Sequence, residues 1–328
     1  MAQDNRCYRI HDDGGGRVRA GFESISLDAL HPGEVVIRTR YASVNYKDAL
    51  AATGRGPIIR RFPCIGGIDA AGVVESSEDS RFSPGDEVVA HGHALGVSHD
   101  GGWCERVRAP AMCVTRLPAG LSLLEAITIG VAGYTAALAV DLMEAFGLAP
   151  AQGEVLVNGA TGGVSSIAID LLAQRGYEVV AVTSKAAEAE YLRSLGAARV
   201  LAAGDSKMGT RPLENAQWAG AVDSLGGQPL AWLTRTMKRD GVIASIGNAA
   251  SVELRTTVMP FILRGVRLVG VNSDNPPETT ARIWSRLAGD LRPRHVQSIA
   301  RVLPFDRLPE AIERVIDGRS RGRAVIEI

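Results

Sequence analysis

The feature that most constrains the fold is an alternation of strand-like and helix-like segments that begins near residue 127. Apolar runs such as "EVLVN" (154–158) and "YEVVAVTS" (177–184) flank the segment "GVSSIAIDLLAQRG" (163–176), which has helical periodicity. The rhythm continues with the strand-like "WAGAVDSLG" (218–226) and with "PLAWLTRTMKRDG" (229–241), which is expected to be helical. Alternating strands and helices of this length predict a parallel, doubly wound sheet.

The first third of the chain consists of short β-rich runs. Segments such as "EVVIRTRYASV" (34–44) and "AAGVVES" (70–76) are bounded by turn signals that contain Gly and Pro, which predicts an irregular antiparallel domain. Because 328 residues exceed what one hydrophobic core usually holds, we expect an α/β protein with two domains. The doubly wound domain is expected at 127–274, and the β-rich domain at 1–126 and 275–328.

The composition is that of an ordinary globular protein, with 46% hydrophobic and 22% charged residues. Lys+Arg and Asp+Glu both number 36, so the net charge gives no argument for a nucleic-acid partner. The start, "MAQDNRCYRIHDD", has no apolar core of a secretory signal. The most apolar stretch, Ala126–Val140, is shorter than the ~20 residues of a membrane span, so it predicts a buried helix.

The cysteines are scattered and contain no C-x-x-C pair. This pattern indicates free thiols in a reducing cytoplasm rather than a disulfide framework or a zinc lobe. We therefore expect a cytoplasmic protein with no nucleic-acid or membrane partner. The four residues concerned are Cys7, Cys64, Cys104 and Cys113.

A glycine-rich loop follows the strand-like run 154–158. The usual dinucleotide pattern is G-x-G-x-x-G, but this loop reads A-x-G-x-x-S, with Ala160, Gly162 and Ser165 at the three positions. The loop is therefore either a dinucleotide site with two glycines replaced or merely a turn. Its place between a strand and a helix favours the dinucleotide site, where backbone N–H groups at the helix start face the pyrophosphate. The predicted contacts are Thr161, Gly162, Gly163 and Val164.

The end of the next strand indicates which dinucleotide is bound. NAD sites place an Asp or Glu there to bind the ribose 2′-hydroxyl, but this chain has Thr183, Ser184 and Lys185. Two hydroxyls and an ammonium suit a 2′-phosphate, which predicts NADPH as the cofactor. The alternative is a solvated loop with an ordinary surface lysine.

Nearly the whole chain resembles the medium-chain dehydrogenase/reductase superfamily, and within it the zinc-free quinone oxidoreductase-like branch that includes bacterial acrylyl-CoA reductases. The resemblance implies a GroES-like catalytic domain, built from the N-terminal part and the C-terminal tail, around a Rossmann domain, with the active site in the cleft between them. The segments that carry it are "SVNYKDALAATGRGPIIRRFP", "GIDAAG", "SEDSRFSPGDEV", "GATGGVSS", "RPLENAQWAGAVDSLG" and "TTVMPFILRGVRLVGVNS".

Two positions that carry zinc ligands in metal-dependent relatives are changed here. By the resemblance they correspond to Asn45 and Ile68, and neither an amide nor an isoleucine is a good zinc ligand. We therefore expect no metal. The alternative is a metal site in the loop that contains His91, His93 and His99, although that segment is more typical of a glycine-rich loop near the substrate.

The resemblance also implies roles for single residues. Asn45 and Tyr46 are the catalytic candidates, and Tyr46 either donates a proton or covers the nicotinamide ribose. Asn248, through its backbone only, and Arg323 are expected near the cofactor, although each could instead be ordinary packing. Further expected cofactor contacts are Thr135, Ile262 and Ser273. Contacts to CoA phosphates, or else a solvated arginine face, are expected at Arg55, Arg60 and Arg61.

The resemblance implies NADPH-dependent reduction of the C=C bond of a short 2-enoyl-CoA, from acrylyl-CoA to propionyl-CoA, without a metal. One alternative is an NADPH quinone or enone oxidoreductase. An alternative of another class is a non-enzymatic NADPH-binding or RNA-binding protein, against which the neutral net charge counts. The apolar strand "VRLVGVNS" (266–273) is expected at the sheet edge, where it would pair two copies into a homodimer.

Overall fold

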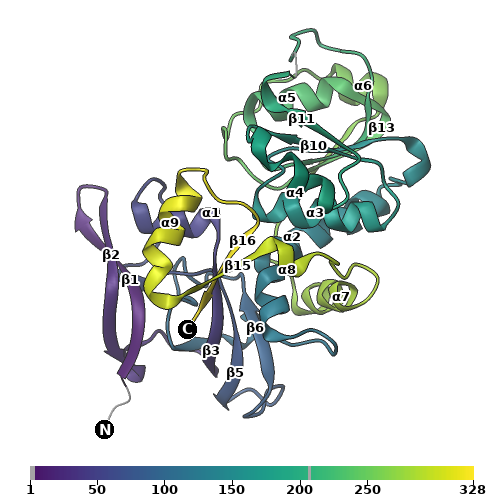
Figure 1. Cartoon of the computed structure of the whole chain (residues 1–328). Coiled ribbons are helices and arrows are strands. Elements are labelled where there is room, and N and C mark those ends of the chain that lie inside the picture. Colours follow the sequence, from purple (N-terminus) through teal and green to yellow (C-terminus); the bar gives the residue numbers. More distant parts are fainter. Residues whose placement is uncertain (1–3, 206–207) are drawn as a thin grey trace. The chain divides into compact units, whose positions relative to one another are not determined.

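Six parallel strands form the sheet that the alternation predicts (Figure 1). Their order, β11–β10–β9–β12–β13–β14, is the order of a dinucleotide-binding doubly wound fold. The computed structural model describes residues 4–205 and 208–328, so the first three residues of the N-terminal segment lie outside the described part. The strands are β9 (Val155–Val157), β10 (Val179–Thr183), β11 (Arg199–Ala202), β12 (Trp218–Asp223), β13 (Met237–Ser245) and β14 (Arg267–Gly270).

Helices lie on both faces of this sheet. In Figure 1, α5 and α6 lie on one side of the strands, and α3 and α4 lie on the other. Apolar side chains of β9 and β10 pack with those of α5 in one core, which holds the helix on the sheet. The helices are α3 (Gly163–Gln174), α4 (Ala189–Ser194), α5 (Gly227–Thr236) and α6 (Met259–Arg264).

One sequence prediction in this region is wrong. Residues 237–241 were expected to continue a helix, but α5 ends at Thr236, and β13 already begins at Met237. Met237 pairs with Trp218 and Val242 pairs with Gly220, with an irregularity between the two pairs. In this stretch Asp240 has a φ of 59°, and its neighbour Arg239 is exposed. In the sequence, the polar residues at the irregular start of β13 therefore resembled the end of a helix.

The β-rich part contains a seven-stranded sheet and a three-stranded sheet. In the larger sheet β15–β16–β3–β5–β6–β8 form the main order, and β7 also pairs with β3; only β15 and β16 run parallel. The smaller sheet is β2–β1–β4. The strands are β1 (Asp4–Gly14), β2 (Arg17–Ser26), β3 (Val35–Val44), β4 (Cys64–Ile65), β5 (Asp69–Ser77), β6 (Glu87–His91), β7 (Arg106–Ala109), β8 (Val114–Arg116), β15 (Ala300–Pro304) and β16 (Arg323–Glu327).

The chain divides into two units. Unit 1 contains the described residues up to Ala132, together with Asp274–Ala288 and Val296–Ile328, and unit 2 contains Gly133–Ser273 and Gly289–His295. The helices of unit 1 are α1 (Tyr46–Thr53), α7 (Pro277–Ala288), α8 (Val296–Ile299) and α9 (Leu308–Ile316).

This division differs from the expected boundaries at Asp274, which groups with unit 1, and in two longer segments. Residues 127–132 group with unit 1, because Ile127 packs against Ala71 and Val325. Residues 289–295 group with unit 2, where both the backbone N–H and Nδ1 of His295 contact the carboxylate of Asp170, at 2.9 and 3.0 Å. The helix α2 (Leu123–Ala145) crosses the first boundary and is interrupted at Gly130.

By length and composition α2 could span a membrane, but 83% of its most apolar window is buried inside the protein. A buried core helix is what the sequence predicts for Ala126–Val140. The four cysteines are free thiols, as predicted, and all four are buried. Burial raises the pKa of Cys7, Cys64 and Cys113 to about 12, so these thiols stay protonated and unreactive at neutral pH.

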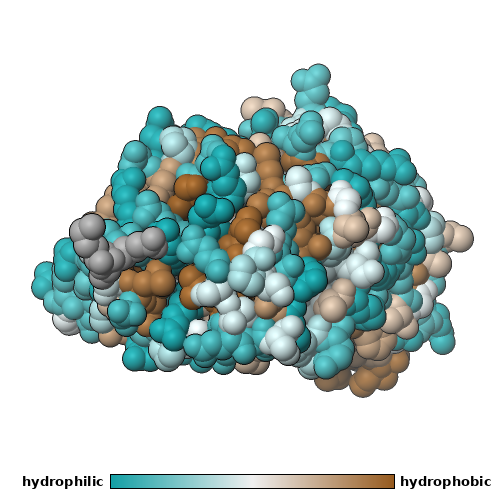
Figure 2. All heavy atoms as spheres, turned by 90° about the horizontal axis from the view of Figure 1, so that it is seen from below, coloured by the Kyte–Doolittle hydropathy of each residue, from teal (hydrophilic) through white to brown (hydrophobic). Residues whose placement is uncertain are grey.

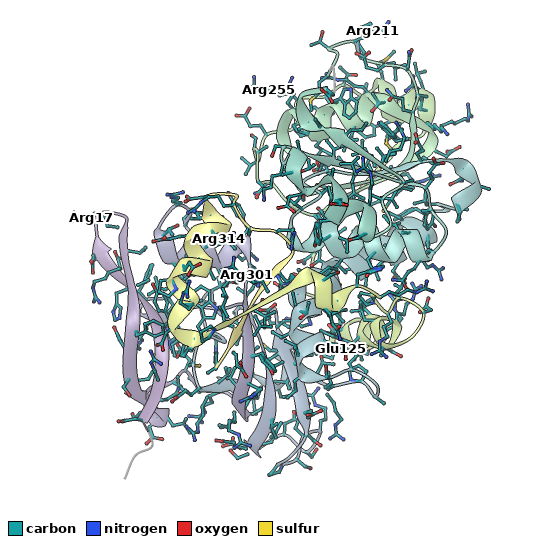
Figure 3. All side chains as sticks on the ribbon, viewed as in Figure 1. Arg17, Glu125, Arg211, Arg255, Arg301 and Arg314 are labelled. Carbon is teal, nitrogen blue, oxygen red and sulfur yellow. The ribbon has the colours of Figure 1, made fainter. Side chains whose placement is uncertain are left out.

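Charged side chains are distributed over many elements. The labelled arginines in Figure 3, such as Arg17, Arg211 and Arg314, project from different parts of the ribbon. Others pair with nearby acids, as Arg116 does with Asp86 at 2.7 Å. The face drawn in Figure 2 mixes polar and apolar side chains. This distribution agrees with the balanced charge of the sequence.

Candidate functional site

Three adjacent strands of unit 1 bring distant residues to one place. The end of β3 lies beside the starts of β16 and β5, because β3 runs antiparallel to both neighbours. Ser43 is near the end of β3, Arg323 begins β16, and Asp69 begins β5. Residues that are far apart in the sequence therefore meet at one edge of the sheet.

Asn45 links this edge to α1. It is the N-cap of the helix, and its backbone N–H donates to Oδ2 of Asp48 at 2.8 Å. The other carboxylate oxygen of Asp48 accepts the backbone N–H of Ile68 at 2.9 Å. Tyr46 is the first helical residue and is 41% exposed. The sequence-predicted pair is thus split: Asn45 faces buried polar groups, and Tyr46 faces outward.

Five side chains form what we call the polar cluster: Ser43, Asn45, Asp48, Asp69 and Arg323. Nη1 of Arg323 donates to Oδ1 of Asn45 at 2.7 Å, and Nη2 donates to Oγ of Ser43 at 2.6 Å and to Oδ2 of Asp69 at 3.2 Å. Nε of Arg323 donates to the carbonyl oxygen of Thr128 at 3.1 Å. Since Arg323 is only 3% exposed, its guanidinium is a fixed internal charge.

The polar cluster holds two carboxylates against one guanidinium. Burial, together with the nearby charge of Asp69, raises the pKa of Asp48 to about 7, although hydrogen bonds from Asn45 and Ile68 oppose the shift. Burial also lowers the pKa of Arg323, and the attraction of Asp69 and Asp48 opposes that change. The burial of these charges is tolerated because each has hydrogen-bond partners.

Gly130 makes room for the polar cluster. Its backbone has φ 46° and ψ −156°, a conformation that interrupts α2. A Cβ at this position would overlap with Oδ2 of Asp69 and would lie 2.9 Å from Nη2 of Arg323. The interruption also lets the N–H of Val131 donate to Oδ2 of Asp69 at 3.0 Å. A glycine is therefore required where the helix meets the buried ion pair.

The histidines at the end of β6 and in the loop that follows have separate surroundings. Nε1 of Trp284 donates to Nε2 of His91 at 2.9 Å, and burial lowers the pKa of His91 to about 4. The backbone N–H of His93 donates to Asp274 at 2.9 Å, and the His99 ring contacts the carbonyl oxygen of Pro32 at 3.0 Å. Within residues 4–205 and 208–328, no three His, Cys, Asp or Glu residues are grouped to hold a metal. The metal-free site itself stays a prediction.

In unit 2 the glycine loop (residues 159–165) connects β9 to α3. Gly159 has φ +54°, whereas Gly162 is the N-cap of α3 and provides no side-chain cap. The first N–H groups of the helix are thus available to an anion, which is the arrangement that a pyrophosphate requires. The N–H of Ala160 donates to the carbonyl oxygen of Val182 in β10 at 3.1 Å. The local geometry therefore fits a dinucleotide.

The serine that replaces the third glycine has a structural role of its own. Oγ of Ser165 donates to the carbonyl oxygen of Asn158 at 2.9 Å and lies 3.3 Å from Oγ of Ser224. The side chain of Asn158 in turn donates to the buried carboxylate of Asp223. The sequence analysis did not single out Asn158, Asp223 or Ser224. The sequence did contain a signal for these residues. They are polar residues at the ends of the apolar strands β9 and β12, and the carboxyl ends of such strands are where ligands bind in doubly wound folds.

The predicted 2′-phosphate contacts follow β10. The hydroxyl of Thr183 is buried and accepts the backbone N–H of Lys185 at 3.0 Å, while Ser184 is exposed. The loop that contains Asn248 lies beside Ser224–Gly226, because the N–H of Ala250 donates to the carbonyl oxygen of Leu225 at 2.8 Å. The glycine loop, residues 183–185 and Asn248 therefore all lie at the carboxyl ends of the parallel strands.

Other predicted contacts have less distinctive surroundings. Thr135 is buried in α2, and Ser273 is partly buried just after β14. Ile262 is 71% exposed on α6, where Leu263 is exposed as well, and so is Val258 just before the helix. Arg55 pairs with Asp317 at 3.3 Å, whereas Arg60 and Arg61 are exposed. The roles of these residues stay predictions.

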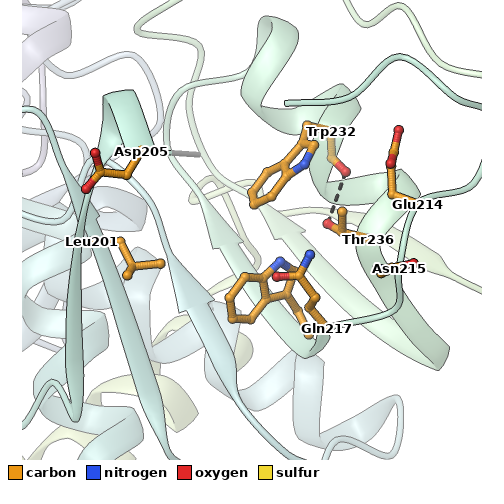
Figure 4. Close-up of a pocket in the computed structure, with 8 residues that line it drawn as sticks. Leu201, Asp205, Glu214, Asn215, Gln217, Trp232 and Thr236 are labelled. Atoms are coloured by element: carbon orange, nitrogen blue, oxygen red, sulfur yellow. Dashed lines mark hydrogen bonds between the residues drawn. The ribbon is translucent and has the colours of Figure 1, made fainter. Parts of the chain in front are cut away.

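A cavity of about 390 Å³ lies elsewhere in unit 2 (Figure 4). Its lining includes the carboxylates of Asp205 and Glu214 and the indoles of Trp218 and Trp232, which are only 2% and 8% exposed. The lining shares no residue with the glycine loop or with residues 183–185. The cavity is therefore not the predicted cofactor site.

Both parts of the chain match known protein families. Residues 31–119 match the alcohol dehydrogenase GroES-like domain, and residues 163–289 match the family called zinc-binding dehydrogenase. Together with the GroES-like sheet and the doubly wound sheet, these matches define an oxidoreductase. The chain belongs to the medium-chain dehydrogenase/reductase superfamily and to its quinone oxidoreductase-like, acrylyl-CoA reductase-related members.

Three relatives illustrate this likeness. The chain is 43% identical to the probable acrylyl-CoA reductase AcuI of Escherichia coli (strain K12) over 95% of its own length and 97% of the relative's. It is 43% identical to YhfP of Bacillus subtilis (strain 168) over 95% of each chain; the name of YhfP assigns it provisionally to the quinone oxidoreductases. The yhdH oxidoreductase of Salmonella enterica, in complex with NADP, is 42% identical with a TM-score of 0.95, over 98% of this chain and 99% of that one.

Proposed function

We propose that this protein uses NADPH to reduce the C=C bond of a short 2-enoyl-CoA, such as acrylyl-CoA, without a metal. The observation that carries the proposal is the 43% identity to a probable acrylyl-CoA reductase over nearly the whole of both chains. The NADP complex of the Salmonella relative supports the cofactor. Asn45 and Ile68, at the positions of zinc ligands, support metal-free chemistry. The buried thiols suit a reducing cytoplasm.

The residues of unit 2 would hold the cofactor. The uncapped N-terminus of α3 suits the pyrophosphate, and Thr183, Ser184 and Lys185 suit the 2′-phosphate. When bound, NADPH supplies the hydride that adds to the β-carbon of the enoyl thioester. The glycine loop would fix the position of the dinucleotide through its backbone.

The residues of unit 1 would stabilise the developing negative charge and supply the proton. An enolate develops at the thioester oxygen, and a hydrogen-bond donor placed there stabilises it. The exposed phenol of Tyr46 can donate a hydrogen bond to this oxygen or to a ribose, or it can transfer its proton to the α-carbon. Arg60 and Arg61 are exposed guanidiniums on the same unit and can bind CoA phosphates. The small acyl group offers little contact area, so the CoA part would supply much of the binding energy.

The decisive test compares kcat/KM for acrylyl-CoA, free acrylate and benzoquinone at a fixed NADPH concentration. We expect acrylyl-CoA to exceed both others by orders of magnitude, and chelators to leave the rate unchanged. Arg60→Ala should reduce the advantage of the thioester and hardly change the rate with a small enone. If free acrylate matches the thioester, the substrate assignment is wrong.

A second candidate function is reduction of quinones, which the similarity to YhfP favours. Both activities would use the same NADPH site, so the residues described above do not separate them. A benzoquinone rate above the acrylyl-CoA rate would replace the first assignment by this one. Tight NADPH binding without turnover of any substrate would favour a non-enzymatic role.

We also propose that two copies pair through β14. This strand ends the order of the parallel sheet, so one of its edges has no partner strand among the described residues. Exposed apolar side chains precede β14 in the chain, both on α6 and before this helix. They include Val252, Val258 and Ile262. A two-fold partner would cover both the edge and these side chains. Light scattering at micromolar concentration should give a dimer for the wild type and a monomer for Ile262→Glu.

A further inference from the structure

The side-chain amide of Asn45 lies between groups of opposite hydrogen-bonding character. On one side Arg323 donates from Nη1 at 2.7 Å. On the other side lie three acceptors: Oδ2 of Asp48 at 3.0 Å, Oγ of Ser43 at 3.2 Å and Oδ1 of Asp69 at 3.4 Å. Ser43 acts as an acceptor here because its own hydroxyl proton goes to Asp69.

The chemistry of these partners permits only one orientation of the amide. A guanidinium has donors and no acceptor, and an ionised carboxylate has acceptors and no donor. A reversed amide would place its NH2 group against Arg323 and its oxygen against Asp48 and Asp69. The contact with Arg323 would then join two donors and the contact with Asp69 two acceptors, in a buried place where an unmatched polar group is expensive. The oxygen therefore faces Arg323, and the nitrogen faces the acids.

This orientation decides what Asn45 can offer to a ligand. Both protons of the NH2 group are directed to buried acceptors, whereas the carbonyl oxygen has two lone pairs and uses one for Arg323. Asn45 is partly exposed, so the second lone pair is its remaining polar capacity toward a ligand. The residue can accept a hydrogen bond, but its amide has no proton left to give.

We propose that Arg323 is a positioning residue that locks Asn45 as a hydrogen-bond acceptor for an N–H or O–H group of the cofactor or substrate. The identity of that ligand rests on the proposed function, whereas the locked orientation does not. It follows that Asn45 does not stabilise the enolate oxygen. That task falls to another donor, such as the exposed phenol of the neighbouring Tyr46.

Asn45→Asp tests the orientation, because it replaces the NH2 group by an oxygen of the same size. In the locked orientation this oxygen faces Asp48, so the folded variant must hold one additional proton between residues 45 and 48. The folded pKa of this pair is then raised, and the stability is lost as the pH rises. Of these two residues only Asp48 titrates in the wild type, and the loss of stability that its deprotonation causes ends near its raised pKa, about 7. Above pH 7 only the variant should therefore lose stability as the pH rises.

Other charged groups near the site do not produce the same signal. Arg323 keeps its charge in this range, and Asp69 is present in both proteins. His91 pairs in register with Asp69, and its pKa of about 4 keeps it neutral above pH 7. A difference between variant and wild type above pH 7 therefore reports on residues 45 and 48.

The experiment measures the melting temperature of the cofactor-free protein between pH 7 and pH 9. We expect that of Asn45→Asp to fall by about 2 °C per pH unit relative to the wild type, the effect of one bound proton in a chain of this size. The matched control, Asn45→Asp with Asp48→Asn, has the wild-type net charge and supplies an N–H toward residue 45, so the additional slope should disappear. Parallel slopes for variant and wild type would overturn the proposal. So would failure of both variants to fold even at pH 6, where the additional proton is available.

A kinetic measurement on the same variant separates this inference from the proposed function. The measurement follows the activity of Asn45→Asp as the pH rises. Because the variant needs the additional proton between residues 45 and 48, its active fraction should fall about tenfold per pH unit above the pKa of this pair. If the additional slope in melting temperature is present but no enoyl-CoA is reduced by the wild type, the orientation stands and the substrate assignment fails.

Discussion

The polar cluster of unit 1 and the glycine loop of unit 2 fix their functional groups in different ways. In the polar cluster, side chains from β3, α1, β5 and β16 hold one another: the guanidinium of Arg323 pairs with Asp69, and the charge of Asp48 acts on it as well. In the glycine loop, the backbone N–H groups at the start of α3 have no side-chain cap, and small side chains shape the turn. The comparison indicates that the cluster depends strongly on each member, whereas the loop tolerates small replacements.

The largest expected effect follows from removing the shared charge. Arg323→Met leaves Asp69 and Asp48 buried without a counter-ion, and breaking a buried pair in this way typically lowers the free energy of unfolding by about 3–5 kcal/mol. Denaturant unfolding followed by tryptophan fluorescence measures it. Arg301→Met is the control, because Arg301 is exposed with only a 3.7 Å pair to Glu310. An effect as small as that of the control would show that the cluster is not a mutually dependent unit.

A smaller loss is expected where the backbone makes room for the cluster. Gly130→Ala forces a side chain into a left-handed conformation, a strain of about 1–3 kcal/mol, and also displaces Asp69 and Arg323. Gly85→Ala separates the two contributions, since Gly85 has φ +94° with no atom within 4 Å of an added Cβ. The melting temperature of Gly130→Ala should fall further than that of Gly85→Ala. Equal changes would mean that crowding at the cluster has no cost.

In the cofactor region the expected effect concerns binding rather than stability. Lys185→Ala should weaken NADPH binding by about 1–3 kcal/mol, the range for a hydrogen bond to a charged group, and should hardly change NADH binding. Isothermal titration with both nucleotides measures this. Lys238→Ala is the control, because Nζ of Lys238 donates to the carbonyl oxygen of Gln152 instead. Equal affinity of the wild type for both nucleotides would contradict the assignment.

The smallest effect is expected in the loop itself. Ser165→Gly restores the usual third glycine but removes the 2.9 Å hydrogen bond to Asn158. A single neutral hydrogen bond contributes about 0.5–1.5 kcal/mol, so both the melting temperature and the NADPH affinity should change little. A large loss of NADPH affinity would show that the loop is as dependent on its side chains as the polar cluster is.

Local patterns predicted unit 2 better than unit 1. The parallel sheet and the start of α3 follow from strands, helices and glycines that lie close together in the sequence. The polar cluster joins Asn45 to Arg323 across 278 positions, so no spacing could predict their contact. Only the resemblance pointed to both residues, and it did not indicate that they contact each other. The strand at 237–241 was missed because tertiary pairing outweighed its helix-like composition.

We propose that unit 2 binds the cofactor through the glycine loop while Arg323 positions Asn45 for the reaction. The most direct test is the single-turnover rate of NADPH oxidation by saturating acrylyl-CoA in Arg323→Lys, which keeps the charge but loses the planar fork. We expect this rate to fall by at least about tenfold, the effect of losing roughly 1.4 kcal/mol of transition-state stabilisation. The dissociation constant of NADPH should stay near that of the wild type. An unchanged rate with weakened NADPH binding would contradict the account.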